Sequence, residues 1–217
     1  MGTRRTACKE RDSAQTQREF LDAVGRLFRK QGFKALTTGK IARETGKDKK
    51  LILYHFGSLD GLLEAYITDK DYWPPFFVRF RLGDEPGSSA VQELFTELMK
   101  ENFKFFKANP EMQQIILWQI SEHNDLLRKV SDAREVAGAK ILAMADPFFE
   151  GSGINIRMVM AILLGGIYYS VLHSQQNKST VSGIDVNRLA DQRAMLKTIG
   201  QVLDWAWQAA AQKQMTK

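Results

Sequence analysis

The sequence predicts an all-α protein with a small basic head at its N-terminal end and a larger helical body. Apolar residues recur every three or four positions along most of the 217 residues, as they do on one face of a helix, and no stretch alternates as a strand would. Residues 1–59 contain 14 Lys and Arg against 6 Asp and Glu, whereas residues 60–217 contain 17 against 19. A basic end joined to a nearly neutral body suggests an anionic partner, with nucleic acid the first candidate and a membrane surface the second.

The composition is that of a globular protein, since 44% of the residues are hydrophobic and 26% are charged. A single cysteine, Cys8, excludes an internal disulfide framework, and three scattered histidines argue against a zinc site. We therefore expect no metal and no cofactor. The first residues lack the apolar core of a secretory signal, and the longest apolar run, 158–172, is short for a membrane span. These features favour a cytoplasmic protein without a membrane partner.

Glycine and polar residues divide the head into three helices and separate it from a fourth helix, which opens the body. The first helix carries apolar residues from Phe20 to Phe28 and ends at Gly32, which can adopt the left-handed conformation. A polar residue suited to a helix N-cap stands before each of the next three helices. These candidate caps are Thr37 or Thr38 for the second helix, Asp48 for the third, and Ser58 or Asp60 for the fourth.

The body is expected to be helical as well. A bend at 73–76 and a loop at 83–89 precede it. Apolar periodicity then predicts a long helix over 91–109 and further helices over 111–122, 125–145, 154–176 and 187–212.

The two short helices that meet at Gly46 form a helix-turn-helix with the longer helix before them. In this motif the second short helix enters the major groove of DNA. Lys47, Lys49 and Lys50 cluster at the N-terminal end of that helix, where the helix dipole also favours phosphate. The alternative is that these lysines only solvate the start of the helix.

The segment 16–63 resembles the DNA-binding head of the TetR (tetracycline-repressor-type) family of bacterial regulators. The resemblance rests on "AVGRLFRKQGFKALTTGKIARETG" and "ILYHFGSLDGLLEAY", which carry an ordered string of family landmarks at fixed spacing. It implies a transcriptional regulator, a repressor that a small, largely apolar effector releases from a pseudo-palindromic double-stranded operator. The corresponding domains are a flexible basic arm (1–15), a helix-turn-helix domain (16–59) and a helical ligand-binding and dimerisation domain (60–217).

The chain departs from the family pattern around the third helix. Lys47 replaces a small apolar residue, and Lys50 and Leu51 stand where a small residue and a Thr or Ser are frequent. Leu53 stands where a phosphate-contacting tyrosine is usual, and Leu59 replaces a lysine that often contacts phosphate. Leu51 or Leu53 could contact thymine methyl groups, or they could pack within the head.

The resemblance and the side-chain chemistry together give a set of expected DNA contacts. Hydroxyl and ammonium groups suit phosphate oxygens, whereas Lys49, Lys50 and Leu51 are expected to read bases. The set is Thr38, Lys40, Lys49, Lys50, Leu51, Tyr54 and His55. In the arm, Arg4 and Arg5 could reach a minor groove, or the arm could be a disordered tail.

The resemblance also implies that aromatic and titratable residues of the body line an effector cavity. Small-molecule sites are mostly apolar with a few polar groups, and these residues supply both. The expected ligand-binding set is Phe103, Phe106, Met112, Trp118, His123, Tyr168, Tyr169 and His173. The alternative is that most of them belong to the ordinary core.

Helices 154–176 and 187–212 are expected to form a homodimer interface. Gly165 and Gly166 lie in the middle of a helix, where glycine is unfavourable and usually has a packing reason such as the close approach of a partner helix. Trp205 and Trp207 could anchor that contact, or they could pack within their own chain.

Two other functional classes compete with an effector-responsive regulator. An enzyme is not expected, because the acidic residues are spread singly and the sequence contains no nucleophile elbow, phosphate-binding glycine loop or zinc motif. A ligand-independent architectural or nucleoid DNA-binding protein with the same head remains an alternative.

Overall fold

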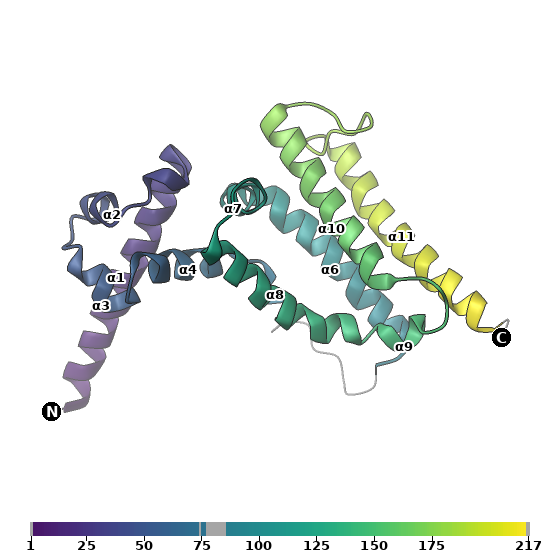
Figure 1. The fold of residues 1–217 in the computed structure, drawn as a ribbon, viewed down its shortest axis with the longest axis horizontal. Coiled ribbons are helices and arrows are strands. Elements are labelled where there is room, and N and C mark those ends of the chain that lie inside the picture. The colour runs from purple at the N-terminus through teal and green to yellow at the C-terminus, as the bar shows by residue number, and fades with distance from the viewer. Residues whose placement is uncertain (1, 74, 77–85, 216–217) are drawn as a thin grey trace. The chain divides into compact units, whose positions relative to one another are not determined.

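The structure is a computed structural model that describes residues 2–73, 75–76 and 86–215 (Figure 1). These residues form helices and no strand, apart from an isolated bridge between Val181 and Ile184, and the expected all-α class is confirmed. In chain order the helices are α1 (Gly2–Gln31), η1 (Phe33–Ala35), α2 (Thr38–Thr45), α3 (Lys50–Phe56), α4 (Leu59–Lys70), α6 (Ser88–Ala108), α7 (Pro110–Ser121), α8 (Asp125–Ala143), α9 (Asp146–Phe149), α10 (Ile156–Leu172), η2 (His173–Asn177) and α11 (Leu189–Met215).

The helices divide into two compact units. The head unit comprises Met1–Asp71 and Trp118–Val130, and the body unit comprises Tyr72–Leu117 and Ser131–Lys217. The expected boundary after residue 59 thus differs from the structural one. The reason is that α4 packs on α1 and α3 and so belongs to the head.

The residues of the expected N-terminal arm belong to a helix in the structure. Residues 1–15 are helical from Gly2 onward and form the first half of α1. Neither glycine nor proline occurs between Gly2 and Gly25, so nothing in this stretch interrupts the helix.

One face of α1 supplies the core of the head. Its buried residues follow the spacing of an amphipathic helix, and α2, α3 and α4 all contact α1. A glycine is needed where α4 turns back after α3, because a Cβ at Gly61 would overlap the carbonyl oxygen of Phe56. The buried core residues of α1 to α4 are Phe20, Ala23, Val24, Leu27, Phe28, Ile41, Ile52, Leu62, Leu63, Tyr66 and Ile67.

A second stretch of chain completes the head. The indole of Trp118 stacks on the ring of Phe33, with 3.3 Å between ring centroids, and lies 6.5 Å from that of Phe28. Farther along, the Lys129 ammonium pairs with the Glu64 carboxylate of α4 at 2.7 Å. The core that α1 begins is therefore closed by residues that lie far away in the sequence.

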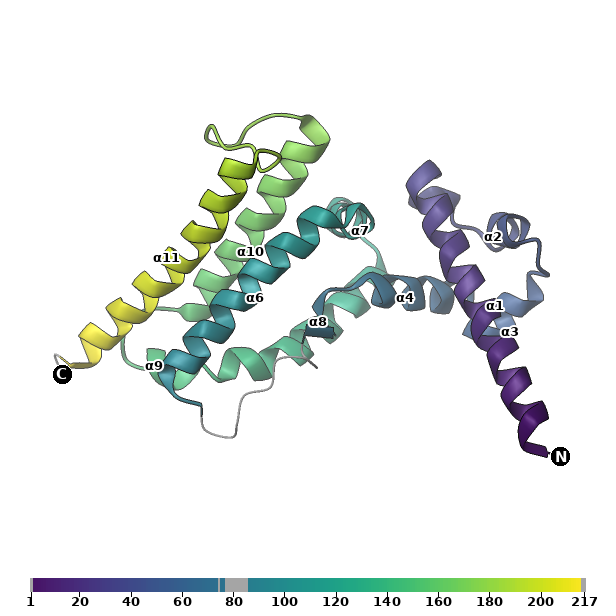
Figure 2. The same ribbon diagram turned by 180° about the vertical axis from the view of Figure 1, so that it is seen from behind.

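The body unit is built around three long helices that run side by side, α6, α10 and α11 (Figures 1 and 2). Buried apolar side chains from all three form one cluster. At its α11 side the Trp207 indole meets the rings of Phe95 and Phe149 edge to face, at centroid distances of 5.6 and 4.7 Å. Trp207 thus packs within its own chain, as one of the two sequence interpretations held.

The expected body helices are present, with two differences. The helix expected over 125–145 ends at Ala143, and the short α9 follows it. The helix expected over 154–176 becomes a π-helical turn from His173. The bend at 73–76 and the loop at 83–89 lie partly outside the described residues.

One helix among the described residues, Ile156–Asn177, is long and apolar enough to cross a membrane by length and composition. It exceeds the apolar run seen in the sequence because polar residues at both ends extend it. Six of its residues are buried, including Met160, Ile167 and Val171, and it packs on α6 and α11. A core helix of a soluble protein meets the same criterion, so the finding is weak evidence for a membrane span.

The buried phenol of Tyr66 generates a prediction about alkaline stability. Its hydroxyl has no hydrogen-bond partner among the described residues, and burial raises the pKa of Tyr66 to about 12. Above pH 10 the unfolded chain ionises this group while the folded head keeps it protonated, so folding stability falls as the pH rises toward 12. We expect Tyr66→Phe to be neutral or slightly stabilising at pH 8 and to remove about 1 kcal/mol of alkaline destabilisation at pH 11.

Denaturant unfolding at pH 8 and at pH 11 measures this difference in stability. Hydrogen exchange of head peptides at pH 8 shows that the unfolding includes the head. Tyr54→Phe removes an exposed phenol from the same unit and serves as the matched control. Equal alkaline losses in the Tyr66→Phe variant and the wild type would contradict the assignment.

Candidate nucleic-acid interface and ligand site

The turn before α3 is held by local hydrogen bonds. The Thr37 hydroxyl caps α2 by accepting the Lys40 backbone N–H at 3.3 Å, and Gly46 ends α2 in the left-handed conformation with φ 68°. The Asp48 carboxylate then accepts the backbone N–H of Lys50 at 2.8 Å, although Lys49 holds the formal cap position of α3. After α3, Ser58 caps α4 through the N–H of Gly61 at 2.9 Å.

Burial of a single residue determines which side of α3 faces outward. Ile52 is 0% exposed, whereas Leu53 and Tyr54 are 58% and 74% exposed. Lys50 is exposed as well, and it shares a face with Leu53 and Tyr54 at i, i+3 and i+4 spacing. The outward face of α3, meaning these three residues, combines a positive charge, an apolar group and a hydroxyl.

Several basic residues of the head are already paired within it. The Lys47 ammonium lies 3.0 Å from the Glu19 carboxylate of α1, and this hydrogen bond lowers the pKa of Glu19. Arg26 pairs with Glu44 at 2.7 Å. No ion pair of Lys49 or Lys50 is found within the described residues, and both side chains are exposed. Of the three clustered lysines, Lys49 and Lys50 are therefore the ones whose charge is available to an anion.

The other expected DNA contacts surround this face less directly. Thr38 is half-buried at the start of α2, and the Lys40 ammonium donates to Gln31 at 3.1 Å. Leu51 is half-buried at the flank of α3. The His55 imidazole is also half-buried and lies 3.4 Å from the Ser13 hydroxyl of α1.

Leu53 is the residue of this face that the expected set leaves out. Its family position predicts a phosphate-contacting hydroxyl, which leucine lacks. Its i+3 relation to Lys50 is the signal that places both on one side of a helix.

Four of the expected ligand-binding residues come together in the body core. Phe103, Phe106 and Met112 are buried, and the half-buried Tyr168 ring lies 4.2 Å from that of Phe106, centroid to centroid. Beside them, Asn102 is 1% exposed, and its side-chain oxygen has no hydrogen-bond partner among the described residues. Its amide nitrogen lies 3.5 Å from the Tyr168 hydroxyl. These residues thus form an apolar core that contains one buried side-chain oxygen without a partner among the described residues, that of Asn102.

The remaining expected ligand residues lie elsewhere. Trp118 and His123 belong to the head unit, where Trp118 is buried against Phe33 and the exposed His123 lies 3.6 Å from Asp125. Tyr169 is exposed on α10, and its ring lies 5.5 Å from that of His173.

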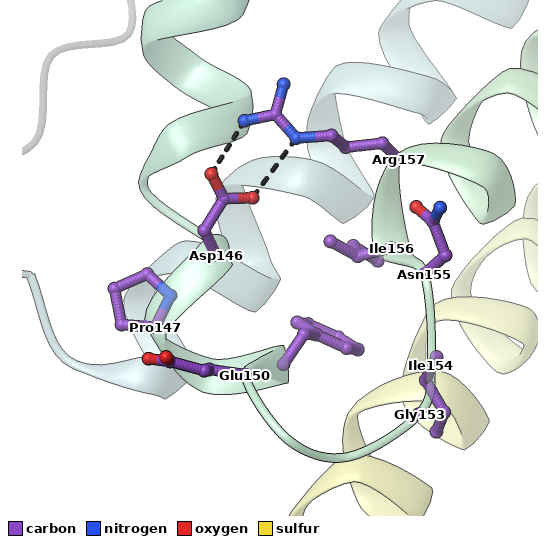
Figure 3. A pocket seen from close by; sticks show the side chains of 9 residues that line it. Asp146, Pro147, Glu150, Gly153, Ile154, Asn155, Ile156 and Arg157 are labelled. Carbon is purple, nitrogen blue, oxygen red and sulfur yellow. Dashed lines mark hydrogen bonds and ion pairs between the residues drawn. The ribbon is translucent and has the colours of Figure 1, made fainter.

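An open hollow of about 570 Å³ lies at the other end of α10 (Figure 3). Arg157 and Asp146 face each other across it and form a bidentate ion pair with distances of 3.1 and 2.6 Å. The two charges satisfy each other, and the hollow contains none of the expected ligand residues. It is therefore not the site that the sequence predicts. Within the described part of the chain, no group of three or more His, Cys, Asp or Glu residues is arranged to hold a metal ion.

The outer surfaces of α10 and α11 carry exposed apolar groups. Met158, Ile162 and Tyr169 are exposed along one side of α10, and Trp205 of α11 is 61% exposed. A Cβ added at Gly165 or Gly166 would meet nothing within 4 Å in the chain itself. Packing inside this chain therefore does not account for either glycine.

The sequence profile of the tetR family of bacterial regulatory proteins matches residues 20–66, which span the helix-turn-helix and most of α4. This part of the chain is therefore similar to the DNA-binding head of that family. The expected resemblance is thereby confirmed, and the protein is a DNA-binding transcriptional regulator. No curated protein matches the chain.

Several solved structures of regulators share the fold of this chain. A fatty acid metabolism regulator from Clostridium perfringens is 17% identical, with 86% of this chain and 97% of that chain covered and a TM-score of 0.63. NalD, the secondary repressor of the MexAB-OprM multidrug efflux pump in Pseudomonas aeruginosa, is 18% identical, with coverage of 88% and 96% and a TM-score of 0.63. FadR from Bacillus subtilis, in complex with stearoyl-CoA, is 16% identical, with coverage of 83% and 96% and a TM-score of 0.60.

The unpaired charges of Lys49 and Lys50 generate the second prediction. Replacing a lysine that contacts phosphate by alanine should weaken binding to all duplexes alike and lower the salt slope by about one, whereas loss of a base-reading lysine should cost about 1–3 kcal/mol at one base pair. We expect Lys49→Ala and Lys50→Ala each to produce one of these two patterns, because neither lysine has an ion-pair partner among the described residues to lose. DNA binding titrated across a range of salt concentrations distinguishes the patterns.

Lys140→Ala is the matched control, because it removes an exposed lysine from the body unit. Wild-type affinity and wild-type salt dependence in both head variants would show that the two lysines only solvate the helix.

Proposed function

We propose that this regulator is a cytoplasmic homodimeric repressor that a small, largely apolar effector releases from a pseudo-palindromic operator. The observation that carries the proposal is the buried, unsatisfied oxygen of Asn102 in a core of aromatic side chains, in the same chain as an exposed basic face on α3. The buried oxygen supports an effector site in the body, and the exposed basic face supports a DNA-binding surface on the head. Thr38, Lys40, Lys49, Lys50, Leu51, Tyr54 and His55 are the proposed DNA contacts.

The proposed dimer interface is the exposed apolar side of α10 together with Trp205 of α11. Exposed aromatic and aliphatic groups on adjacent long helices are typical of interface cores. A helix of a second copy could approach closely at Gly165 and Gly166, where no side chain intervenes. A dimer presents two copies of α3, and two-fold symmetry then requires two half-sites about one helical turn apart.

The effector would bind at Asn102, Phe103, Phe106, Met112 and Tyr168. The Phe106 and Tyr168 rings are in contact, so an effector that enters between them must separate them. The packed and the separated arrangements then differ in effector affinity, which is the requirement for a ligand to shift a population. Because FadR was solved with stearoyl-CoA, long acyl chains are the first effector class to test. The other expected ligand residues lie outside this group and are secondary candidates for effector contacts. They are Trp118, His123, Tyr169 and His173.

A ligand-independent architectural role is not favoured, because it leaves the buried side-chain oxygen of Asn102 without an explanation. Buried polar groups are hydrogen-bonded in the great majority of cases, and each exception calls for one. An enzymatic role is not proposed, since the family and the matched proteins are regulators.

The proposed interface predicts how the dimer can be broken. Replacing Ile162 by aspartate places a charge on the exposed apolar side of α10, where a second copy would have to desolvate it. We expect Ile162→Asp to yield a folded monomer by sedimentation at micromolar concentration and to reduce operator affinity at least tenfold. Val136→Asp, on the exposed surface of α8, is the control and should remain dimeric. A wild-type monomer with and without DNA would contradict the dimer.

The proposed effector site predicts reciprocal coupling with DNA. If an effector weakens operator binding by some factor, the operator must weaken effector binding by the same factor. Stearoyl-CoA and shorter acyl-CoAs can be titrated with and without operator, with coenzyme A alone as the control. We expect Asn102→Leu to stabilise the unliganded protein by about 1 kcal/mol, since the cost of a buried oxygen without a partner exceeds the long hydrogen bond that is lost to Tyr168, and to weaken effector binding. Equal acyl-CoA affinity with and without operator would exclude that effector class, and unchanged affinity in Asn102→Leu would misplace the site.

A further inference from the structure

Leu53 is a large apolar side chain that is exposed to solvent on the short helix α3. It is 58% exposed on a seven-residue helix whose neighbouring Ile52 is completely buried. Packing within the head was one interpretation of this residue from the sequence, and its exposure removes that interpretation. Leu51, the alternative apolar candidate, is half-buried at the flank of α3.

The surroundings of Leu53 specify the chemistry of its partner. Lys50 and Tyr54 flank it on the outward face of α3, and Lys49 precedes them. Two unpaired ammonium groups favour a polyanion, and phosphates would hold the helix in place without reading sequence. A leucine has no hydrogen-bonding group, so it can neither bind phosphate nor read donors and acceptors on base edges. The apolar feature that the major groove offers is the C5 methyl group of thymine.

We propose that Leu53 reads a thymine in each operator half-site by contacting its C5 methyl group. This inference rests on the proposed function, since it requires an operator. It assigns base discrimination to a position where the family pattern has a phosphate-contacting tyrosine. The chain thus exchanges a sequence-independent contact for a sequence-dependent one, and Lys49 and Lys50 supply the charge that anchors the helix.

Removing the thymine methyl group alone tests the proposal. Binding sites are first selected from randomised duplexes with the full-length wild-type protein, and each thymine of the selected site is then replaced in turn by deoxyuridine. We expect a deoxyuridine in one half-site to weaken wild-type binding about threefold to fourfold, and replacement in both half-sites to weaken it about tenfold, as burial of one methyl group per half-site predicts. Replacement of any other thymine by deoxyuridine should leave wild-type binding unchanged.

The same duplexes are titrated with Leu53→Ala, which shortens an exposed side chain to a good helix former and leaves Ile52 in place. We expect this variant to bind thymine and deoxyuridine duplexes equally well at the sensitive position. Val136→Ala shortens an exposed apolar residue of the body and should keep the full wild-type dependence on the methyl group.

Three results overturn the proposal: a selected half-site without thymine, a wild-type protein insensitive to every deoxyuridine, or a Leu53→Ala variant that keeps the wild-type sensitivity. In each of these cases the protein still binds its operator, so the proposed function stands. Failure of the wild type to bind any duplex overturns both.

Discussion

The complete burial of one side chain, Ile52, sets the orientation of the helix that carries the proposed DNA-binding face. A seven-residue helix is too short to be stable alone, so α3 exists because it packs on α1 and α4. With Ile52 turned inward, the 3.6-residue period places Lys50, Leu53 and Tyr54 outward. The Asp48 cap and the pairing of Lys47 with Glu19 act on the same helix, one at its start and one in the preceding turn. The buried Ile52 side chain thereby determines which side chains of α3 are exposed for the proposed contact with DNA.

The helices and caps of the helix-turn-helix could be read from the sequence, because their signals are local. Thr37 and Ser58 cap their helices as expected, and Gly46 has the positive φ that its position between two helices requires. Which lysines are available could not be read in this way. Lys47 and Lys49 are equally charged and nearly adjacent, and only the fold brings Glu19, 28 residues earlier, to one of them.

The body could be predicted only as helices. Apolar periodicity places residues on a face but does not say what that face meets, and the two tryptophans of α11 illustrate the difference. Trp205 and Trp207 are two residues apart, so they point about 160° away from each other on an ideal helix. One is exposed and the other is enclosed by two phenylalanine rings. Likewise, Trp118 follows the aromatic residues of α6 in the sequence and yet belongs to the core of the other unit.

The head is assembled from two stretches of chain, and this limits how the protein can be recombined. A fragment ending at Asp71 would include every residue matched by the family profile, yet it would lack the indole that covers Phe33 and the ammonium that pairs with Glu64. A chimaera that joined this head to the body of a relative would inherit a foreign side chain at the position of Trp118. The C-terminal turn of α7 must therefore evolve together with η1, even where the rest of the body is free to diverge.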